Sequence, residues 1–250
     1  MEEAIDTLKS TAWPTVLHVT HQKAGSQWLR RILYGCAPER VVFAEYGMVQ
    51  FLQKPVRSGM VYPTLYVTRE EFDRVILPPN ARHFVVIRDL RDTLVSWYFS
   101  AKVSHVVDNP LVAEMRATIN ALTLEQGLIW LMEDPHFQKA AAVQRSWLRY
   151  RDRLIRYEDL LERDLEILER VLLQECGVPV GRARLREVVH ANRFEQLTGR
   201  MRGTEDIASH ERKGVAGDWR NYFTDRVKEL FKERFCNILI ETGYERASDW

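Results

Sequence analysis

The chain has 250 residues, 46% of them hydrophobic, so it can bury a substantial core, and its length suits one large α/β domain better than two small ones. Lys and Arg together number 36 and Asp and Glu 35, which gives a formal net charge of +1. This balance creates no overall field for nucleic acid or an anionic membrane, so neither is an expected partner. We predict a single domain over residues 1–250, with any anion site built locally.

The N-terminal sequence does not resemble a secretory signal. Met1 is followed by Glu2, Glu3 and Asp6, whereas a signal peptide needs a basic start and an apolar stretch, and no apolar run reaches membrane length. We therefore expect a soluble, cytoplasmic protein. The three cysteines are far apart and lack CxxC spacing, which argues against both a disulfide framework and a zinc site.

The first two structural units have the same pattern, a strand followed by a helix. The β-branched run Thr15–Thr20 predicts a strand, and the apolar residues between Trp28 and Leu33 recur at helical spacing, with the loop His21–Ser26 between them. The continuous apolar run His83–Ile87 predicts a second strand, buried and parallel to the first. A helix rich in aromatic residues is expected over Asp92–Ala101.

A third unit is expected from the strand Leu154–Tyr157 and the helix after it, which ends near Gly177. The apolar face of this helix is predicted to carry Leu161, Leu165, Leu168 and Leu172. Helical patterns also fill Ser104–Trp147, and an amphipathic helix is expected before Gly243. Alternating strands and helices predict an α/β fold in which helices cover both faces of a parallel sheet.

The loop after the first strand contains residues that suit a bound phosphate. Backbone N–H groups at a helix start favour an anion, Gly25 permits close approach, Ser26 supplies a hydroxyl and a plausible helix cap, and Lys23 supplies positive charge. The lysine precedes the glycine, so the segment does not match the GxxxxGK[ST] loop of ordinary ATPases and GTPases. A capped surface turn is the alternative interpretation.

Arg88 follows the second predicted strand and Ser96 lies on the helix after it, at the edge where open parallel sheets bind ligands. Both could reach one phosphate. Arg88 could equally form a structural ion pair with Asp89 or Asp92, and Ser96 could be an exposed helix residue. The sequence leaves both interpretations open.

A third candidate segment lies near the C-terminal end, at Glu211–Phe223. It combines adjacent cations with two glycines and an aromatic cluster, a composition that suits a loop folded over an anion. A charged surface loop anchored by Trp219 is the other interpretation.

Taken together, these segments resemble the PAPS-dependent sulfotransferase superfamily, especially its cytosolic type; PAPS is 3′-phosphoadenosine 5′-phosphosulfate. Gln22-Lys-Ala-Gly-Ser-Gln-Trp28 is similar to the PKSGTTW phosphosulfate loop of the family, and Val86-Ile-Arg-Asp-Leu-Arg-Asp-Thr-Leu-Val-Ser-Trp-Tyr98 is similar to its 3′-phosphate motif. Arg212-Lys-Gly-Val-Ala-Gly-Asp-Trp219 resembles the RKGxxGDW signature, and Tyr157-Glu158-Asp159 the YED segment. The order along the chain also agrees.

The resemblance implies a three-layer, P-loop-like α/β fold and the transfer of a sulfuryl group from PAPS to a hydroxyl or amine of a small-molecule acceptor, with release of PAP. It assigns each candidate residue to a part of the donor. No metal is expected, because the sequence shows no evident cluster of ligand residues and the positive charge comes from Lys23, Arg88, Arg212 and Lys213. The 5′-phosphosulfate would be held by Lys23, Gly25, Ser26, Gln27 and Trp28, with Trp28 also near the adenine; the 3′-phosphate by Arg88, Ser96, Arg212, Lys213 and Gly214; and the base would lie near Tyr157 and Phe194.

Sulfuryl transfer, like phosphoryl transfer, depends on an in-line acceptor and a stabilised leaving group, so Lys23 is the expected electrophilic partner. The family's general base is a histidine in a KTHLP-like segment, but the counterpart here, Tyr62–Val67, contains none. We expect His105 to take this role, with Glu45, His21 and His210 as the other candidates. A carboxylate such as Glu45 would suit an amine acceptor.

Two alternatives remain open at this point. A P-loop kinase for a small metabolite is disfavoured by the missing GK[ST] loop and by the lack of an obvious Mg²⁺ arrangement. A protein that binds PAP or PAPS without catalysis would retain Lys23 and Arg88, and the missing histidine is consistent with it. The identity of the acceptor and the oligomeric state are not predicted.

Overall fold

The computed structural model describes residues 13–107, 109–149 and 154–250. Four parallel strands form one sheet in the order β2-β1-β3-β4 within this part of the chain. Short 3₁₀ turns (η1, Pro38–Arg40; η2, Tyr46–Met48; η6, Asp218–Asn221) and π-helical turns (η3, Ser100–Ser104; η5, Glu169–Glu175) join or extend the helices. The strands are β1 (Thr15–Val19), β2 (Val61–Leu65), β3 (Ala81–Ile87) and β4 (Leu154–Arg156); the helices are α1 (Ser26–Cys36), α2 (Val49–Leu52), α3 (Arg69–Asp73), α4 (Leu90–Phe99), α5 (Pro110–Ala121), α6 (Leu124–Leu131), α7 (Pro135–Trp147), α8 (Tyr157–Leu168), α9 (Arg182–Ala191), α10 (Phe194–Thr198) and α11 (Asp225–Glu241).

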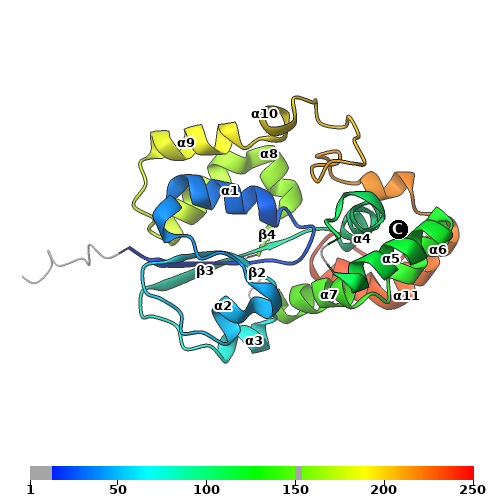
Figure 1. The fold of residues 1–250 in the computed structure, drawn as a ribbon, viewed down its shortest axis with the longest axis horizontal. Coiled ribbons are helices and arrows are strands. Elements are labelled where there is room, and N and C mark those ends of the chain that lie inside the picture. Colours follow the sequence, from blue (N-terminus) through cyan, green and yellow to red (C-terminus); the bar gives the residue numbers. More distant parts are fainter. Residues whose placement is uncertain (1–12, 108, 150–153) are drawn as a thin grey trace, which may run out of the picture.

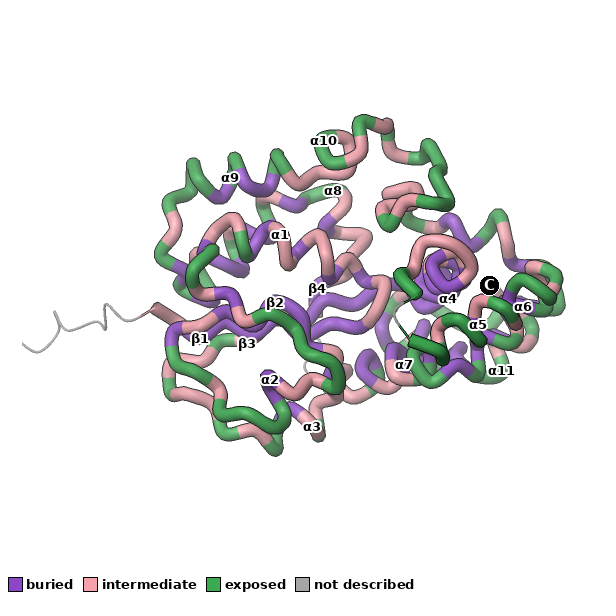
Figure 2. The backbone as a smooth tube through the Cα atoms, viewed as in Figure 1, coloured by how far each residue is buried: buried purple, intermediate pink, exposed green. Residues whose placement is uncertain are grey.

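Alternate residues of the central strands supply the two faces of the sheet with apolar side chains. Phe84 and Val86 of β3 face a cluster with α1, α8 and α9, whereas Val85 and Ile87 face one with α2, α3 and α7. Figure 1 shows helices on both sides of the sheet, and Figure 2 shows that the central strands are buried. The predicted α/β fold with a helix-flanked parallel sheet is confirmed.

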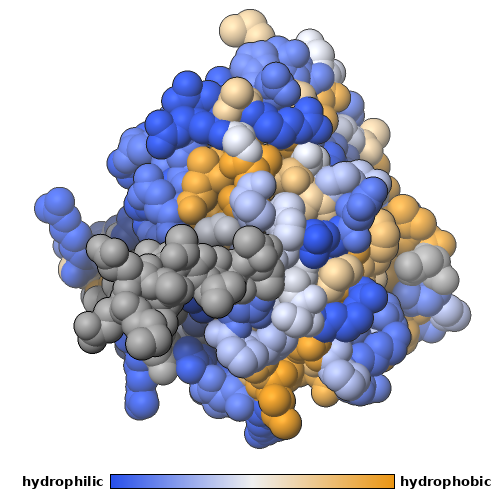
Figure 3. Space-filling view, turned by 90° about the vertical axis from the view of Figure 1, so that its left-hand side faces the viewer, coloured by the Kyte–Doolittle hydropathy of each residue, from blue (hydrophilic) through white to orange (hydrophobic). Residues whose placement is uncertain are grey.

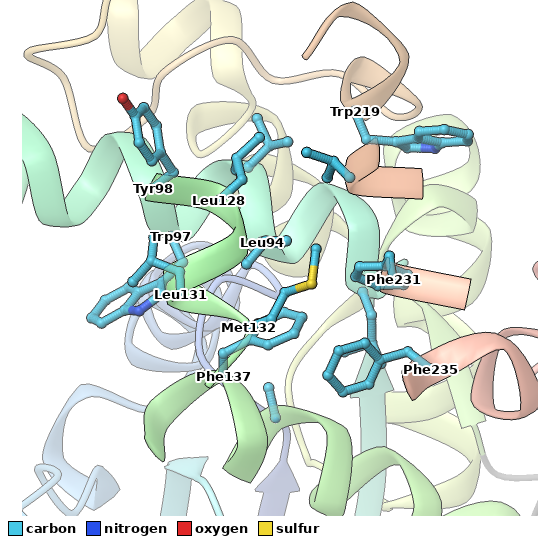
Figure 4. Close-up of a cluster of buried hydrophobic side chains, with 14 of the residues drawn as sticks. Leu94, Trp97, Tyr98, Leu128, Leu131, Met132, Phe137, Trp219, Phe231 and Phe235 are labelled. Atoms are coloured by element: carbon cyan, nitrogen blue, oxygen red, sulfur yellow. The ribbon is translucent and has the colours of Figure 1, made fainter. Parts of the chain in front are cut away.

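A third cluster of apolar side chains packs α4 against α6, α7 and α11, beside the sheet (Figures 1 and 4). Leu94 and Trp97 of α4 lie among Phe137, Phe231 and Phe235, and these side chains are all buried. This cluster holds α4 against the C-terminal helix. It thereby fixes the helix that carries Ser96.

One strand escaped prediction, because β2 contains Pro63, which cannot donate to a ladder hydrogen bond. The sheet tolerates this proline because β2 is the terminal strand in the sheet order. The predicted apolar face of the third helix is largely confirmed: Leu168 and Leu172 are buried, and Leu165 is half-buried against the same cluster. Leu161 is the exception, because it lines the pocket described below. The backbone leaves helical geometry at Arg163, which shifts the buried face.

No helix in the described ranges is long and apolar enough to cross a membrane. On the face shown in Figure 3, hydrophilic side chains cover most of the surface and the apolar ones gather in separate patches.

Candidate functional site

Each strand of the sheet is followed, at its carboxyl end, by a residue that lines one common pocket. These residues are Lys23 after β1, Tyr66 after β2, Arg88 after β3 and Tyr157 after β4. Parallel strands end at the same edge, and ligands of open α/β sheets bind beyond that edge. The pocket is completed by α4 and by the segment before η6, which lie at this end of the sheet in Figure 1.

The loop between β1 and α1 has the shape of an anion cradle. Lys23 and Gly25 have φ values of 66° and 81°, and Gly25 is the N-cap of α1, with no side chain capping the free N–H groups. A Cβ at Gly25 would lie 2.8 Å from the ring of Tyr157, so only glycine fits. Ser26 begins the helix and does not cap it, contrary to the expectation; its Oγ lies 2.9 Å from Tyr66 Oη.

Lys23 lies in a setting that disfavours its own charge. Burial, followed by the nearby charge of Arg88, lowers the pKa of Lys23 to about 8, although Glu211 partly offsets the effect. A bound anion would remove this cost by compensating the crowded cations. The loop is therefore built for a negatively charged ligand.

Arg88 is only 9% exposed, and it forms part of the pocket lining. Nη1 donates to the carbonyl oxygen of Lys23 at 3.0 Å, and the guanidinium stacks 4.7 Å from the ring centroid of Tyr157. No ion pair joins Arg88 to Asp89 or Asp92 in the described structure; Asp89 pairs with Arg91 instead. The structural ion pair left open by the sequence is therefore not the role of Arg88.

The residues 211–215 bring two more cations and a glycine to the pocket. Asp218 accepts hydrogen bonds from Arg212 at 2.5 Å and from Lys213 at 2.6 Å. Gly214 has a φ of 65°, and a Cβ there would lie 2.6 Å from the ring of Phe194. The two cations are thus held in place by a carboxylate, and the glycine allows the backbone to lie against an aromatic ring.

This segment is also tied to the rest of the pocket wall. Glu211 pairs with Arg31 of α1 at 2.5 Å, which joins the segment to the first helix. The carboxylate of Asp92 accepts from the N–H groups of Gly217 at 2.6 Å and Trp219 at 2.9 Å. Two backbone hydrogen bonds to Asp92 therefore hold this segment against the start of α4.

A buried arginine supports the same junction. The guanidinium of Arg91 lies 4.1 Å from the ring centroid of Trp219 and 4.3 Å from that of Trp250. It pairs with Asp89 at 2.7 Å and with Glu245 at 2.5 Å. The C-terminal residues thus pack against the segment that carries the pocket cations.

The structure brings the predicted donor-binding residues and the favoured base, His105, to this one pocket. It also adds residues that the sequence reasoning did not assign, among them Arg31, Tyr66, Trp97, Ser100, Asn192 and Arg202. Tyr66 would have been found had β2 been recognised. The predicted residues that line the pocket are Lys23, Gly25, Ser26, Gln27, Trp28, Arg88, Ser96, His105, Tyr157, Phe194, Arg212, Lys213 and Gly214.

Two of the four candidate bases lie away from the pocket lining. His21 is buried: its Nδ1 donates to the Gln22 carbonyl at 2.8 Å and its Nε2 accepts from the Arg88 N–H at 3.2 Å. Burial lowers the pKa of His21 to about 4, so the ring is a neutral structural link. Glu45 is exposed and pairs with Lys54 at 2.7 Å.

His105 and His210 both line the pocket. His105 follows the π-helical turn after α4 and stands edge-on to Trp97, with 5.6 Å between ring centroids. Burial, followed by the charge of Lys23, lowers the pKa of His210 to about 4. Both histidines therefore line the pocket that contains Lys23, whereas His21 and Glu45 do not.

Comparison with known proteins agrees with this geometry. A family model described as the sulfotransferase domain matches residues 14–243. The chain belongs to the sulfotransferase family. The sequence resemblance is thereby confirmed, and the family is one of enzymes.

The sulfotransferase domain is shared with several characterised proteins. Human sulfotransferase 1C2 is 24% identical over 251 residues, covering 87% of this chain and 80% of that one. The 3-alpha-hydroxysteroid sulfotransferase of Cavia porcellus is 24% identical over 240 residues, covering 85% and 79%. The crystal structure of mouse sulfotransferase SULT7A1 with PAP has a TM-score of 0.66 at 19% identity, covering 99% of this chain and 93% of that one. Retinol dehydratase, in a complex with retinol and PAP, has a TM-score of 0.57 at 14% identity, covering 91% and 82%.

Proposed function

We propose that this sulfotransferase moves a sulfuryl group from PAPS to a hydroxyl or amine of a small-molecule acceptor and releases PAP. The observation that carries the proposal is the convergence of Lys23, Arg88, Arg212 and Lys213 on one pocket at the carboxyl edge of the sheet. PAPS carries anionic groups at both its 5′ and 3′ positions, so it needs cations at two places. The PAP complexes of the two structural neighbours support the choice of nucleotide.

The pocket suggests how the donor would lie. The 5′-phosphosulfate would occupy the loop from Lys23 to Trp28, where free N–H groups and the lysine meet. The 3′-phosphate would meet Arg88, Ser96 and the 212–214 segment. The adenine would then lie between the aromatic side chains of Trp28, Tyr157 and Phe194.

In this arrangement Lys23 would face the oxygen that bridges sulfur and phosphorus. That oxygen gains negative charge as the S–O bond breaks, so the lysine would stabilise the transition state more than the bound donor. We retain His105 as the proposed base for the acceptor, since it lines the pocket and His21 and Glu45 do not. His210 is the alternative.

The acceptor is proposed to be a small molecule, as in the relatives whose names include a hydroxysteroid or a flavonol. We also infer that the chain acts as a single catalytic domain, because the proposed site combines Lys23 with Arg212, near opposite ends of the sequence. A cytoplasmic location stays a prediction.

The test is an acceptor screen with radiolabelled PAPS, in parallel with PAP binding by calorimetry. Transfer of label to an alcohol, phenol or amine would support the proposal. Binding of PAP without transfer to any class would support a non-catalytic nucleotide-binding protein. Binding of ATP with Mg²⁺ in preference to PAP would overturn the assignment and favour a kinase.

A further inference from the structure

A tyrosine stands where the edge strand β2 meets the pocket. Tyr66 directly follows β2 and, within the described chain, is the pocket-lining residue that this strand and its end contribute. Its hydroxyl lies 2.9 Å from Oγ of Ser26, the first residue of α1. The phenol therefore reaches the start of the helix whose N–H groups and neighbouring lysine form the proposed phosphosulfate cradle.

The hydrogen bond between these two hydroxyls leaves one of their two O–H groups available to donate. Each hydroxyl has one O–H to donate, and the bond between Tyr66 and Ser26 uses only one of the two. Within the described structure, neither hydroxyl has a further hydrogen-bond acceptor. Whichever residue donates in the pair, the other has an O–H available for an acceptor at the helix start.

The Tyr66 hydroxyl stays protonated at physiological pH. Burial raises the pKa of this phenol above its usual value of 10.0, although the bond to Ser26 and the charge of Arg30 oppose the effect. A phenol in this state donates a hydrogen bond and does not act as a general base. Such a donor suits a ligand group that has acceptor oxygens and negative charge.

We propose that Tyr66 is a catalytic residue whose hydroxyl, paired with Ser26, hydrogen-bonds an oxygen of the sulfuryl group during transfer. The inference rests on the proposed function and adds a residue to it. The contact would orient the sulfur for in-line attack by the acceptor, whose proposed base, His105, lines the same pocket. Because PAP lacks the sulfuryl group, the contact would distinguish donor from product.

The decisive variant is Tyr66→Phe, which keeps the ring and removes the hydroxyl. We expect PAPS affinity, measured without acceptor, to fall by about tenfold and PAP affinity to stay unchanged, the loss typical of one hydrogen bond to a charged group. The value of kcat should fall as well, because the sulfuryl group is less well oriented. Tyr34→Phe is the matched control, since Tyr34 is 47% exposed and lies outside the pocket.

A purely structural link between β2 and α1 predicts something different. In that case Tyr66→Phe would lower the melting temperature, leave the ratio of PAPS to PAP affinity at the wild-type value and leave kcat unchanged, and the proposal would be wrong. If the wild-type chain binds PAP and transfers sulfuryl groups but Tyr66→Phe behaves like Tyr34→Phe, only the role of Tyr66 fails. If the wild-type chain binds neither PAP nor PAPS, the proposed function fails first.

Discussion

Arg88 donates a hydrogen bond from Nη1 to the carbonyl oxygen of Lys23, at 3.0 Å. The residue proposed for the 3′-phosphate therefore also holds the backbone of the residue proposed for the sulfuryl end. Lys23 has a φ of 66°, a conformation that costs free energy for a residue other than glycine and needs support from its surroundings. This hydrogen bond therefore links the two ends of the proposed donor site.

Replacing Lys23 by Met should reduce turnover far more than nucleotide affinity. In the proposed role, the contribution of the lysine would grow as charge develops on the leaving oxygen, so we expect kcat to fall by roughly 10²-fold or more and PAP affinity to change by about tenfold at most. Single-turnover rates at saturating PAPS measure the effect. Unchanged turnover would show that another group stabilises the leaving phosphate.

Replacing Arg88 by Ala should weaken PAP binding, because the 3′-phosphate would lose its proposed buried partner. The change should also slow turnover, because the Lys23 carbonyl loses its donor. Arg82→Ala is a suitable control, since that arginine is exposed. A normal kcat at saturating PAPS would show that the contact with the Lys23 backbone does not matter for catalysis. Unchanged PAP affinity would remove Arg88 from the donor site.

Without a bound ligand, the buried charge of Lys23 should lower the free energy of unfolding. Burial, then Arg88, lowers its pKa from 10.5 to about 8 in the folded chain, so between these values the unfolded chain holds more protons and stability rises with pH. Below pH 8 Lys23 is charged in both the folded and the unfolded chain, so the full free-energy cost of burying its charge is present. Lys23→Met should therefore stabilise the ligand-free protein at pH 7, by about 1 to 3 kcal/mol, and the gain should vanish towards pH 10.5. Denaturant unfolding at both pH values measures it.

The 3′-phosphate should dominate nucleotide recognition. PAP should raise the melting temperature much more than adenosine 5′-phosphate at equal concentration, because only PAP has the group that Arg88 and Arg212 would meet. Equal shifts from the two nucleotides would contradict the assignment of this end of the pocket.

Activity should not require a divalent metal. The described residues contain no group of three or more His, Cys, Asp or Glu placed to hold an ion, and the pocket supplies its own cations. We expect the rate of sulfuryl transfer to be the same with and without EDTA. Loss of activity in EDTA that Mg²⁺ restores would contradict the prediction.

The sequence predicted the parts of the fold that depend on local pattern. The apolar runs of β1 and β3 and the amphipathic helices were recognisable because burial imposes a regular period. The edge strand β2 was missed because Pro63 interrupts its pattern, and Tyr66 was missed with it. The pairing of Arg31 with Glu211 joins residues 180 positions apart, and no local pattern predicts such a contact.

The candidate site was recognisable for a different reason. Lys23, Arg88 and Arg212 each lie in a segment with its own family motif, so the set could be assembled before any geometry was known. The motifs did not show which candidate bases reach the pocket: His105 and His210 line it, whereas His21 is hydrogen-bonded to the Arg88 backbone. Nor could the motifs show that Arg88 donates a hydrogen bond to the carbonyl oxygen of Lys23.

The guanidinium of Arg91 contacts the rings of both Trp219 and Trp250, so we expect the C-terminal residues to unfold locally together with the segment that carries Arg212. Opening that segment would separate Trp219 from Arg91 and leave a buried guanidinium without one of its two ring contacts. A nucleotide that orders the segment should therefore slow amide hydrogen exchange around Tyr244 and Trp250, although neither residue lines the pocket. Occupancy of the donor site could then be followed at the C-terminal end of the chain without adding any acceptor.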